Sequence, residues 1–213
     1  MQRDYPNVNV RWSPYLLNPA IPPEGQPREP QTTADSPKSH LELMGETRGL
    51  TFKRGRTFTP NSHFALEASE FAYDHGQHSD AFHRALFKAN FEDFENIGEI
   101  DVLARIASEH EMDGAQLRQA LTNGDYRDKV DEQIEWARTV GVTGVPTFIF
   151  DYKYAIVGAQ EYEAFERVMG TIASEGGGEG YDAPAESAQQ AAPQTTDQAL
   201  TVDTPSKDPD WAI

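Results

Sequence analysis

The 213-residue sequence contains no cysteine. This absence excludes disulfide bonds, thiolate catalysis and cysteine-ligated metal sites for the chain as given. The sequence also lacks an apolar run near the ~18 residues that are needed to cross a bilayer. The segment from Met1 to Pro6 does not have the pattern of a signal peptide. We therefore expect a cytoplasmic protein.

Basic residues are scarce: 18 Lys and Arg stand against 35 Asp and Glu, for a net charge of -17. This charge repels nucleic acid and anionic lipid, so we expect neither as a partner. It is also typical of proteins from a high-salt cytoplasm, where salt screens self-repulsion, although an acidic tail alone is the alternative. Hydrophobic residues make up only 38% of the chain, which indicates that some segments are not packed.

The first part of the chain combines a strand pattern with proline-rich loops. Apolar and polar residues alternate from Val8 to Trp12, which predicts a half-buried strand. Prolines between Ser13 and Gly25 exclude a helix there, and residues 26–38 have the composition of a flexible surface loop. His40 to Met44 predicts a short helix that Gly45 limits.

Apolar residues at helical spacing predict a series of helices between residues 59 and 139. Asn61 or Ser62 caps the first of them, and Asp101 and Asp113 cap two later ones. The predicted helices cover residues 64–76, 79–89, 102–107, 114–121 and 126–139.

Two β-branched and aromatic runs, Thr147–Asp151 and Tyr154–Val157, predict a β-hairpin. Pro146 stands at its entrance, where a proline marks either the start of an edge strand or a cis peptide bond. The spacing from Gln160 to Ile172 predicts a last packed helix. The residues after Ala173 have little to bury and indicate a disordered tail, in which only Trp211 is a candidate for docking.

Three places in the chain carry a resemblance to a known family. They are Val8–Pro19 with Pro22–Gly25, Thr59–Tyr73 with Phe82–Phe91, and Gly141–Phe148 with Tyr154–Gln160. Together they resemble the DsbA family of thioredoxin-fold proteins, most closely its FrnE-like branch. The third place is the most specific, and coverage runs from about Tyr5 to Ile172 in the order that such proteins show.

The resemblance implies an α/β, thioredoxin-like (DsbA-type) fold with an inserted helical subdomain, N-terminally incomplete. Residues 1–58 would then form part of the thioredoxin-like domain, with a strand and a loop. Residues 59–139 would be the helical insertion, and residues 140–173 would return to the thioredoxin-like domain with the cis-proline loop, hairpin and last helix. Residues 174–213 would be the acidic disordered tail.

By the same resemblance, Pro146 matches the family's cis-proline, which faces the redox-active cysteines. The backbone of Val145 matches the position that pairs with a bound peptide or thiol substrate. Gly144, Val145 and Pro146 are therefore the predicted substrate-binding residues, with no catalytic residue beside them. A trans proline that merely begins a strand is the alternative.

The departure from the family pattern is as informative as the match. Family members begin with a strand and a Cys-x-x-Cys at a helix N-terminus, which stabilises a thiolate. Neither this unit nor its serine version occurs here. The absent strand would lie between Val8–Trp12 and Thr147–Asp151 and would leave unpaired edges. We therefore expect Met1 to be an internal methionine of a longer reading frame, or the chain to repack or borrow a strand in a homo-oligomer.

Other groupings of polar residues predict no site. His75-x-x-His78, near Asp74 and Asp80, is interrupted by Gly76 and lacks a third ligand at a familiar spacing, so we expect no metal. Ser62 and His63 are adjacent and point in different directions, which is poor geometry for proton transfer. The acidic residues Glu92, Asp93 and Glu95 indicate a solvated face.

The sequence thus supports three functional hypotheses. The first is the family's thiol-disulfide oxidoreduction, which a chain without cysteine cannot perform, so the protein is expected to be redox-inactive as given. The second is a non-catalytic module that binds a peptide or partner at the cis-proline loop. The third is a glutathione-linked isomerase. We expect no bound cofactor.

Overall fold

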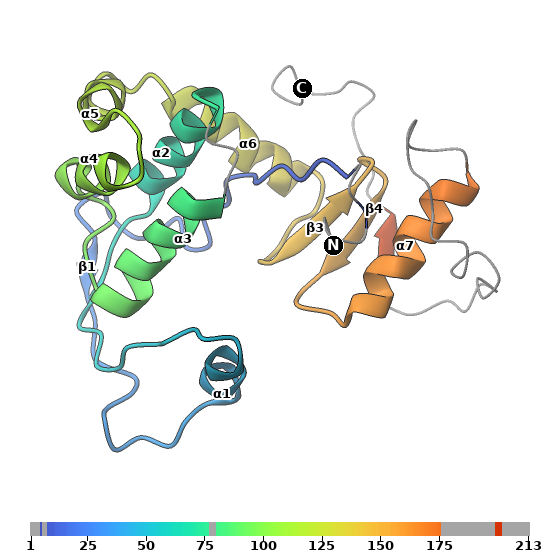
Figure 1. Cartoon of the computed structure of the whole chain (residues 1–213), viewed down its shortest axis with the longest axis horizontal. Coiled ribbons are helices and arrows are strands. Elements are labelled where there is room, and N and C mark those ends of the chain that lie inside the picture. The colour runs from blue at the N-terminus through green and yellow to red at the C-terminus, as the bar shows by residue number, and fades with distance from the viewer. Residues whose placement is uncertain (1–4, 6–7, 77–79, 176–198, 202–213) are drawn as a thin grey trace. The chain divides into compact units, whose positions relative to one another are not determined.

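The computed structural model describes residue 5 and residues 8–76, 80–175 and 199–201. Contacts divide the chain into two compact units, which we call the helical unit (Asn18–Glu132) and the strand unit (Met1–Leu17 with Gln133–Ile213). In chain order (Figure 1) the elements are β1 (Gln26–Pro27), α1 (His40–Thr47), β2 (Phe58–Thr59), α2 (His63–Asp74), α3 (Asp80–Lys88), the π-helical turn η1 (Ala89–Asp93), α4 (Ile100–Glu109), α5 (Gly114–Asn123), α6 (Arg127–Thr139), β3 (Thr147–Phe150), β4 (Tyr154–Val157), α7 (Tyr162–Ser174) and β5 (Ala199–Thr201).

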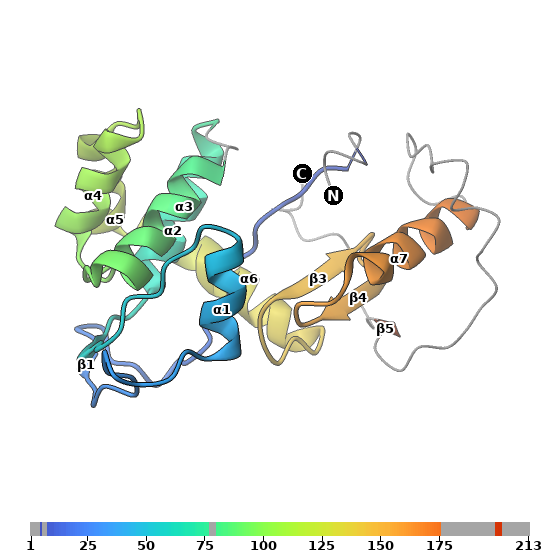
Figure 2. The same ribbon diagram turned by 60° about the horizontal axis from the view of Figure 1, so that its bottom comes forward.

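The helical unit is built around one apolar core. Helix α4 packs against α3 and α5, and α2 packs against the same two helices (Figures 1 and 2). Phe71 of α2, Phe82 of α3, Leu103 of α4 and Leu117 of α5 are each at most 2% exposed in this core. Truncating one such side chain typically costs about 2–5 kcal/mol of stability. The predicted helical stripes therefore become the faces that hold this unit together.

The helix starts test the predicted caps. The side chain of Asp113 accepts hydrogen bonds from the N–H groups of Ala115 and Gln116, which confirms it as the cap of α5. At α2, Asn61 accepts from the N–H of His63, whereas Ser62 makes no side-chain cap bond.

The predicted cap at Asp101 is wrong. Helix α4 already begins at Ile100, so Asp101 lies inside its first turn and Glu99 occupies the N-cap position. Ile100 packs against the core of the helical unit, and this contact extends the helix beyond the start that the capping pattern indicates.

The segment before α2 is more ordered than its composition indicates. Ser39 and Glu42 form a reciprocal capping box at the start of α1, which continues through Gly45 to Thr47. A Cβ at Gly45 would lie 2.6 Å from the ring of Phe52, so glycine here permits close packing rather than ending the helix. Residues 26–38, predicted as a flexible loop, include β1, which pairs antiparallel with β2 through Gln26 and Thr59.

The strand unit contains the predicted hairpin. Strands β3 and β4 pair antiparallel with Thr147 opposite Val157, and the sheet order is β3-β4-β5. Strand β5 contradicts the predicted disorder at residues 199–201, because the outer edge of β4 accepts their backbone hydrogen bonds. The remainder of the predicted tail beyond Glu175, including Trp211, lies outside the described residues.

Helix α7 covers one face of the hairpin. It packs against β4, as Figures 1 and 2 show, and joins Ile156 to Val168 and Ile172 in a small buried cluster. The ring of Phe165 on α7 lies edge-on to Phe148, with ring centroids 4.9 Å apart. The last predicted helix is therefore confirmed, with its start and end each shifted by two residues toward the C-terminus.

The predicted strand from Val8 to Trp12 is wrong. These residues have no regular secondary structure and pair with no described strand. Alternating polarity favours a strand only where a neighbouring strand accepts its backbone hydrogen bonds, and β3 does not accept them here. The domain boundaries at residues 58, 139 and 173 stay predictions, although the helical unit includes residues 18–58.

A membrane-spanning helix was also sought. In the described ranges of the chain, no helix is both long and apolar enough to cross a bilayer.

Candidate functional site

The loop that carries the predicted site residues leaves the C-terminal end of α6. There the N–H of Gly141 donates to the carbonyl of Arg138, and the N–H of Val142 donates to the carbonyl of Ala137. These two bonds form a Schellman motif, which requires a residue with positive φ at Gly141, whose φ is 83°. The glycine thus ends the helix and directs the chain into the loop.

The peptide bond between Val145 and Pro146 is cis, as the sequence predicted. Two hydrogen bonds hold the residues around it. The hydroxyl of Thr147 donates to the carbonyl of Gly144 at 2.7 Å, and the N–H of Gly158 donates to the carbonyl of Pro146 at 2.8 Å. The second bond continues the β3–β4 pairing past the strand end, so the loop is fastened to the hairpin on both sides of the proline.

The three predicted substrate-binding residues lie together in this loop. They differ in exposure, in backbone hydrogen bonding and in whether the position requires its residue type. Val145 is 52% exposed, and neither its N–H nor its C=O bonds to a described residue. Gly144 has no positive φ, and nothing lies within 4 Å of a Cβ built on it. Gly144 therefore needs no glycine for its conformation, whereas Val145 presents free backbone groups. Their role in binding stays a prediction.

The outer edge of β3 is open among the described residues. Hydrogen-bonded pairs alternate along an antiparallel ladder, and the bond from Gly158 to Pro146 sets the phase. The backbone groups of Phe148 and Phe150 therefore face β4, while those of Thr147 and Ile149 face away from it. With Val145, they form a row of unpaired donors and acceptors along one edge, which we call the open edge.

The side chains beside the open edge are partly apolar. Because cross-strand partners share a face, Val157 lies on the same face as Thr147, opposite the face that α7 covers. Val157 is 40% exposed, and Phe148 on the α7 face is 37% exposed. Sequence reasoning identified Val145 but missed Thr147 and Ile149. The two-residue period of β3 was the available signal for them.

The strand unit contains neither a cysteine nor a histidine. The chain has no cysteine, and all six histidines fall between residues 18 and 132, within the helical unit. The hydroxyl of Thr147 is engaged with a carbonyl. A nucleophile needs an adjacent base or a lowered pKa, and the loop supplies neither. What the loop offers among the described residues is the unbonded backbone groups of Val145.

His63 is held between two carboxylates instead of pairing with Ser62. Its Nδ1 lies 2.8 Å from Glu67 Oε1 and its Nε2 lies 2.9 Å from Asp131 Oδ1. Carboxylates only accept hydrogen bonds, so this geometry fits an imidazolium that donates from both nitrogens. The pKa of His63 is raised, first by the hydrogen bond to Glu67 and then by Asp131, against a lowering by burial.

The cluster of His63, Glu67 and Asp131 is a structural link between α2 and α6. Glu67 is fully buried, and its second oxygen, Oε2, has no hydrogen-bond partner among the described atoms. The imidazolium therefore compensates a buried carboxylate, which would otherwise be expensive to keep in the interior. The rejection of a Ser62–His63 catalytic pair agrees with this arrangement.

The other rejected groupings also have structural partners. His75 bonds to the carbonyl of Phe71 and to Gln116, while His78 lies outside the described residues. Within the described ranges, no group of histidine and acidic side chains is arranged to hold a metal ion. In the acidic segment, Asp93 pairs with Lys88 and Glu95 pairs with Arg105. This segment is a set of surface ion pairs rather than an acid-base site.

Comparisons with known proteins agree with this fold. A family model described as a DSBA-like thioredoxin domain matches residues 1–170. The chain is 28% identical over 165 residues to the uncharacterized protein YwbO of Bacillus subtilis (strain 168), covering 76% of this chain and 82% of that protein. A crystal structure described as a probable DsbA oxidoreductase, SCO1869 from Streptomyces coelicolor, superposes with a TM-score of 0.64 at 24% identity. That match covers 80% of this chain and 82% of the other.

Proposed function

Because this chain belongs to the family of DSBA-like thioredoxin domains, we propose that it binds an extended peptide segment along the open edge. The fold is the mixed α/β, DsbA-like thioredoxin fold with several helices. The single observation that carries the proposal is the row of unpaired backbone groups formed by Val145, Thr147 and Ile149 among the described residues. Such an edge accepts an added strand through main-chain hydrogen bonds.

The side chains around the open edge define the class of peptide. Val157 is exposed on the side away from α7 and Val145 is exposed just before β3, so β-branched residues suit the alternate positions of a bound strand. The net charge of -17 favours a peptide with basic ends. An uncharged or basic, β-branched segment is therefore the expected ligand.

The proposed function is binding without thiol chemistry by this chain. Thiol-disulfide exchange requires attack by a thiolate, and the sequence holds no cysteine and so no Cys-x-x-Cys active site. Placement in the FrnE-like branch stays part of the proposal, supported by the order of the matched segments from Val8 to Gln160. The glutathione-linked isomerase has no specific observation in its favour, and we do not propose it.

The test measures binding of a fluorescent peptide by anisotropy. The probe is a peptide of about seven residues that alternates valine and threonine and carries a lysine at each end. We expect saturable binding to the wild-type chain. Substitution Ile149→Pro removes one N–H from the open edge without touching the β4 ladder, and is expected to weaken binding by at least about ten-fold.

The matched control is Ile149→Ala, which shortens the same side chain and keeps the N–H. We expect it to retain affinity within about three-fold, because the main chain supplies most of the bonding. Circular dichroism confirms that both variants are folded. Equal affinity for the wild-type chain and a folded Ile149→Pro variant would exclude the open edge as the binding site.

A further inference from the structure

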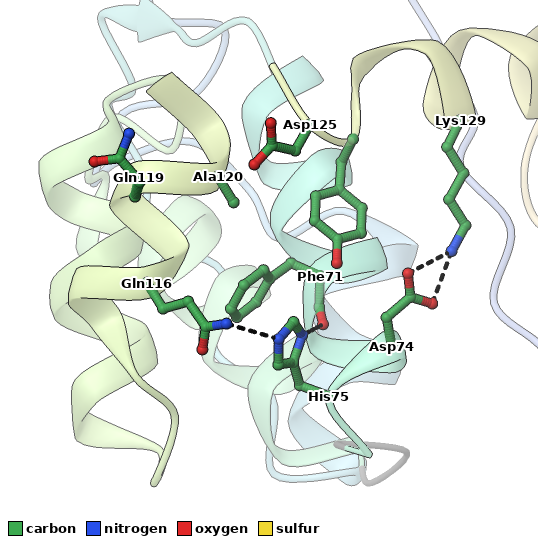
Figure 3. Close-up of a pocket in the computed structure, with 9 residues that line it drawn as sticks. Phe71, Asp74, His75, Gln116, Gln119, Ala120, Asp125 and Lys129 are labelled. Atoms are coloured by element: carbon green, nitrogen blue, oxygen red, sulfur yellow. Dashed lines mark hydrogen bonds and ion pairs between the residues drawn. The ribbon is translucent and has the colours of Figure 1, made fainter. Parts of the chain in front are cut away.

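A surface pocket of about 350 Å³ lies in the helical unit, away from the residues of the open edge in sequence and in a different unit. Its walls come from the end of α2, from α5, and from the turn that leads into α6. Figure 3 shows Gln116 and Ala120 on one side, Phe71 and His75 below, and Asp125 above. Its size falls within the range that is typical of small-ligand sites.

The floor of the pocket is an ordered aromatic surface. The rings of Phe71 and His75 stack with centroids 4.0 Å apart, and Tyr126 meets Phe71 edge-on at 5.7 Å. His75 Nδ1 lies 2.8 Å from the carbonyl of Phe71, so this nitrogen carries the hydrogen. Nε2 then accepts from the side-chain amide of Gln116 at 3.2 Å, as drawn in Figure 3.

The hydrogen bond to His75 fixes the orientation of the Gln116 amide. Because its nitrogen donates to the ring, its carbonyl oxygen remains as an acceptor without a partner among the described residues. Gln119 likewise uses its nitrogen to bond Asn123 Oδ1 at 2.8 Å. The α5 wall therefore presents amide oxygens rather than amide nitrogens for further bonding.

The one cation in the pocket is already neutralised. Lys129 Nζ lies 2.7 and 2.9 Å from the two oxygens of Asp74, and 3.3 Å from Glu70 (Figure 3 shows the Asp74 contacts). Asp125 is the second carboxylate that lines the pocket, and it makes only a long contact of 3.5 Å with Asn123. The two lining carboxylates outnumber the one ammonium, and the buried Glu70, which contacts Lys129 without lining the pocket, adds a further negative charge.

The pKa of the Tyr126 hydroxyl is raised by its surroundings in the pocket. Burial raises its pKa to about 12, and Asp74, Asp125 and Glu70 contribute in the same direction. The tyrosine therefore stays protonated, hydrogen-bonds to Asp74, and adds no further charge to the pocket. Its aromatic ring lines the pocket, with Lys129 Nζ 5.8 Å from the ring centroid.

We propose that this pocket binds an organic cation, a guanidinium or alkylammonium group on a short aliphatic chain. The carboxylate of Asp125 and the amide oxygen of Gln116 accept hydrogen bonds from the cation, and the rings of His75 and Tyr126 pack against its apolar part. The carboxylates repel an anion, and a neutral donor can hydrogen-bond to them but lacks the charge attraction that a cation gains. This inference does not rest on peptide binding at the open edge.

The test follows the full-length chain by two-dimensional NMR during titration with ethylguanidinium, n-butylamine, ethylurea and acetate. Ethylurea has the same size as ethylguanidinium but no charge. We expect the two cations to shift the side-chain amide signals of Gln116 and the ring signals of Tyr126 saturably. Their affinity should exceed that of ethylurea by at least about five-fold at low salt and should fall as salt screens the carboxylates.

Two substitutions that each remove one negative charge, one inside and one outside the pocket, make the test specific to the pocket. Asp125→Asn should weaken cation binding by about five-fold, whereas Asp128→Asn, an exposed aspartate that does not line the pocket, should change it less than two-fold. Gln119→Glu should strengthen binding by adding a carboxylate to the α5 wall.

A blocked tripeptide with a central arginine distinguishes the source of the cation. Tighter binding of the tripeptide than of ethylguanidinium indicates a peptide side chain, and the reverse order indicates a small free cation. Preference for acetate or ethylurea over both cations, or an equal effect of Asp125→Asn and Asp128→Asn, would overturn the proposal.

Discussion

The helical unit and the strand unit differ in the size of their buried apolar clusters. In the helical unit, α2, α3, α4 and α5 enclose side chains such as Leu103 and Leu117 completely. In the described part of the strand unit, the cluster under α7 contains only Ile156, Val168 and Ile172 as buried members. The strand unit, which has the smaller core, also has the open edge, where backbone groups make no hydrogen bond to a described residue. The larger core and the open edge thus lie in different units of the chain.

The largest expected effect compares the two cores directly. Leu103→Ala, at a fully buried position, should lower the free energy of unfolding by about 3–5 kcal/mol, because it leaves a cavity among packed helices. Val168→Ala removes fewer atoms from a smaller cluster and should cost about 1–2 kcal/mol. Urea denaturation with residue-resolved hydrogen exchange measures both. Equal costs would show that the two cores are packed alike.

A second effect comes from the ionic cluster of the helical unit. His63→Leu leaves Glu67 buried without its imidazolium. Breaking a fully buried ion pair costs about 3–5 kcal/mol, and we expect a smaller loss of about 2–3 kcal/mol because the His63 side chain is 23% exposed. The double variant His63→Leu with Glu67→Leu should recover most of this loss, since both charges are removed. Thermal denaturation measures the cycle, and a double variant no more stable than His63→Leu argues against compensation.

The same cluster predicts a pH dependence that the strand unit does not share. The pKa of His63 is raised in the folded state, so its contribution is fully present below the ordinary value of 6.5 and is lost as pH rises through the raised pKa. The wild-type chain should therefore lose stability on the alkaline side of 6.5. The control is His63→Gln, in which this part of the pH profile should be flat. A parallel profile in both chains would assign the effect to other groups.

The smallest effect concerns a surface ion pair of the strand unit. Lys153 and Glu175 lie 2.5 Å apart, but their side chains are 52% and 42% exposed. Lys153→Met should therefore leave the free energy of unfolding almost unchanged, because water and salt screen the pair. Measuring it beside His63→Leu tests whether burial, rather than charge, decides the value of an ion pair in this chain. A loss comparable with that of His63→Leu would contradict this.

Local patterns in the sequence determined several elements correctly. The hairpin of β3 and β4 and the Asp113 cap agree with the structure. The cis bond before Pro146 followed from the resemblance to a family, because the local pattern left a trans proline open. The prediction at Val8–Trp12 was wrong, because alternation specifies which side chains face a core but does not supply a neighbouring strand. The Asp101 cap was wrong because packing of Ile100 extended the helix.

The two candidate sites differ in how far the sequence reveals them. The loop at Val145 and Pro146 is a contiguous stretch, so its position followed from a motif and its resemblance to a family. The pocket gathers Phe71, Gln116 and Asp125 from three segments and carries no motif. The bonds of His63 to Glu67 and Asp131 likewise join different segments and carry no motif, although the sequence correctly rejected a Ser62–His63 pair.

The sequence by itself determined the absence of cysteine, the negative charge, the helical stripes and the β3–β4 hairpin, because these depend on residue type or on neighbours in the chain. Only the tertiary structure decided which backbone edge stays open, which carboxylate His63 compensates and where the pocket forms. Those features depend on contacts between residues that are distant in sequence, and such contacts are set by packing of whole elements rather than by local preference.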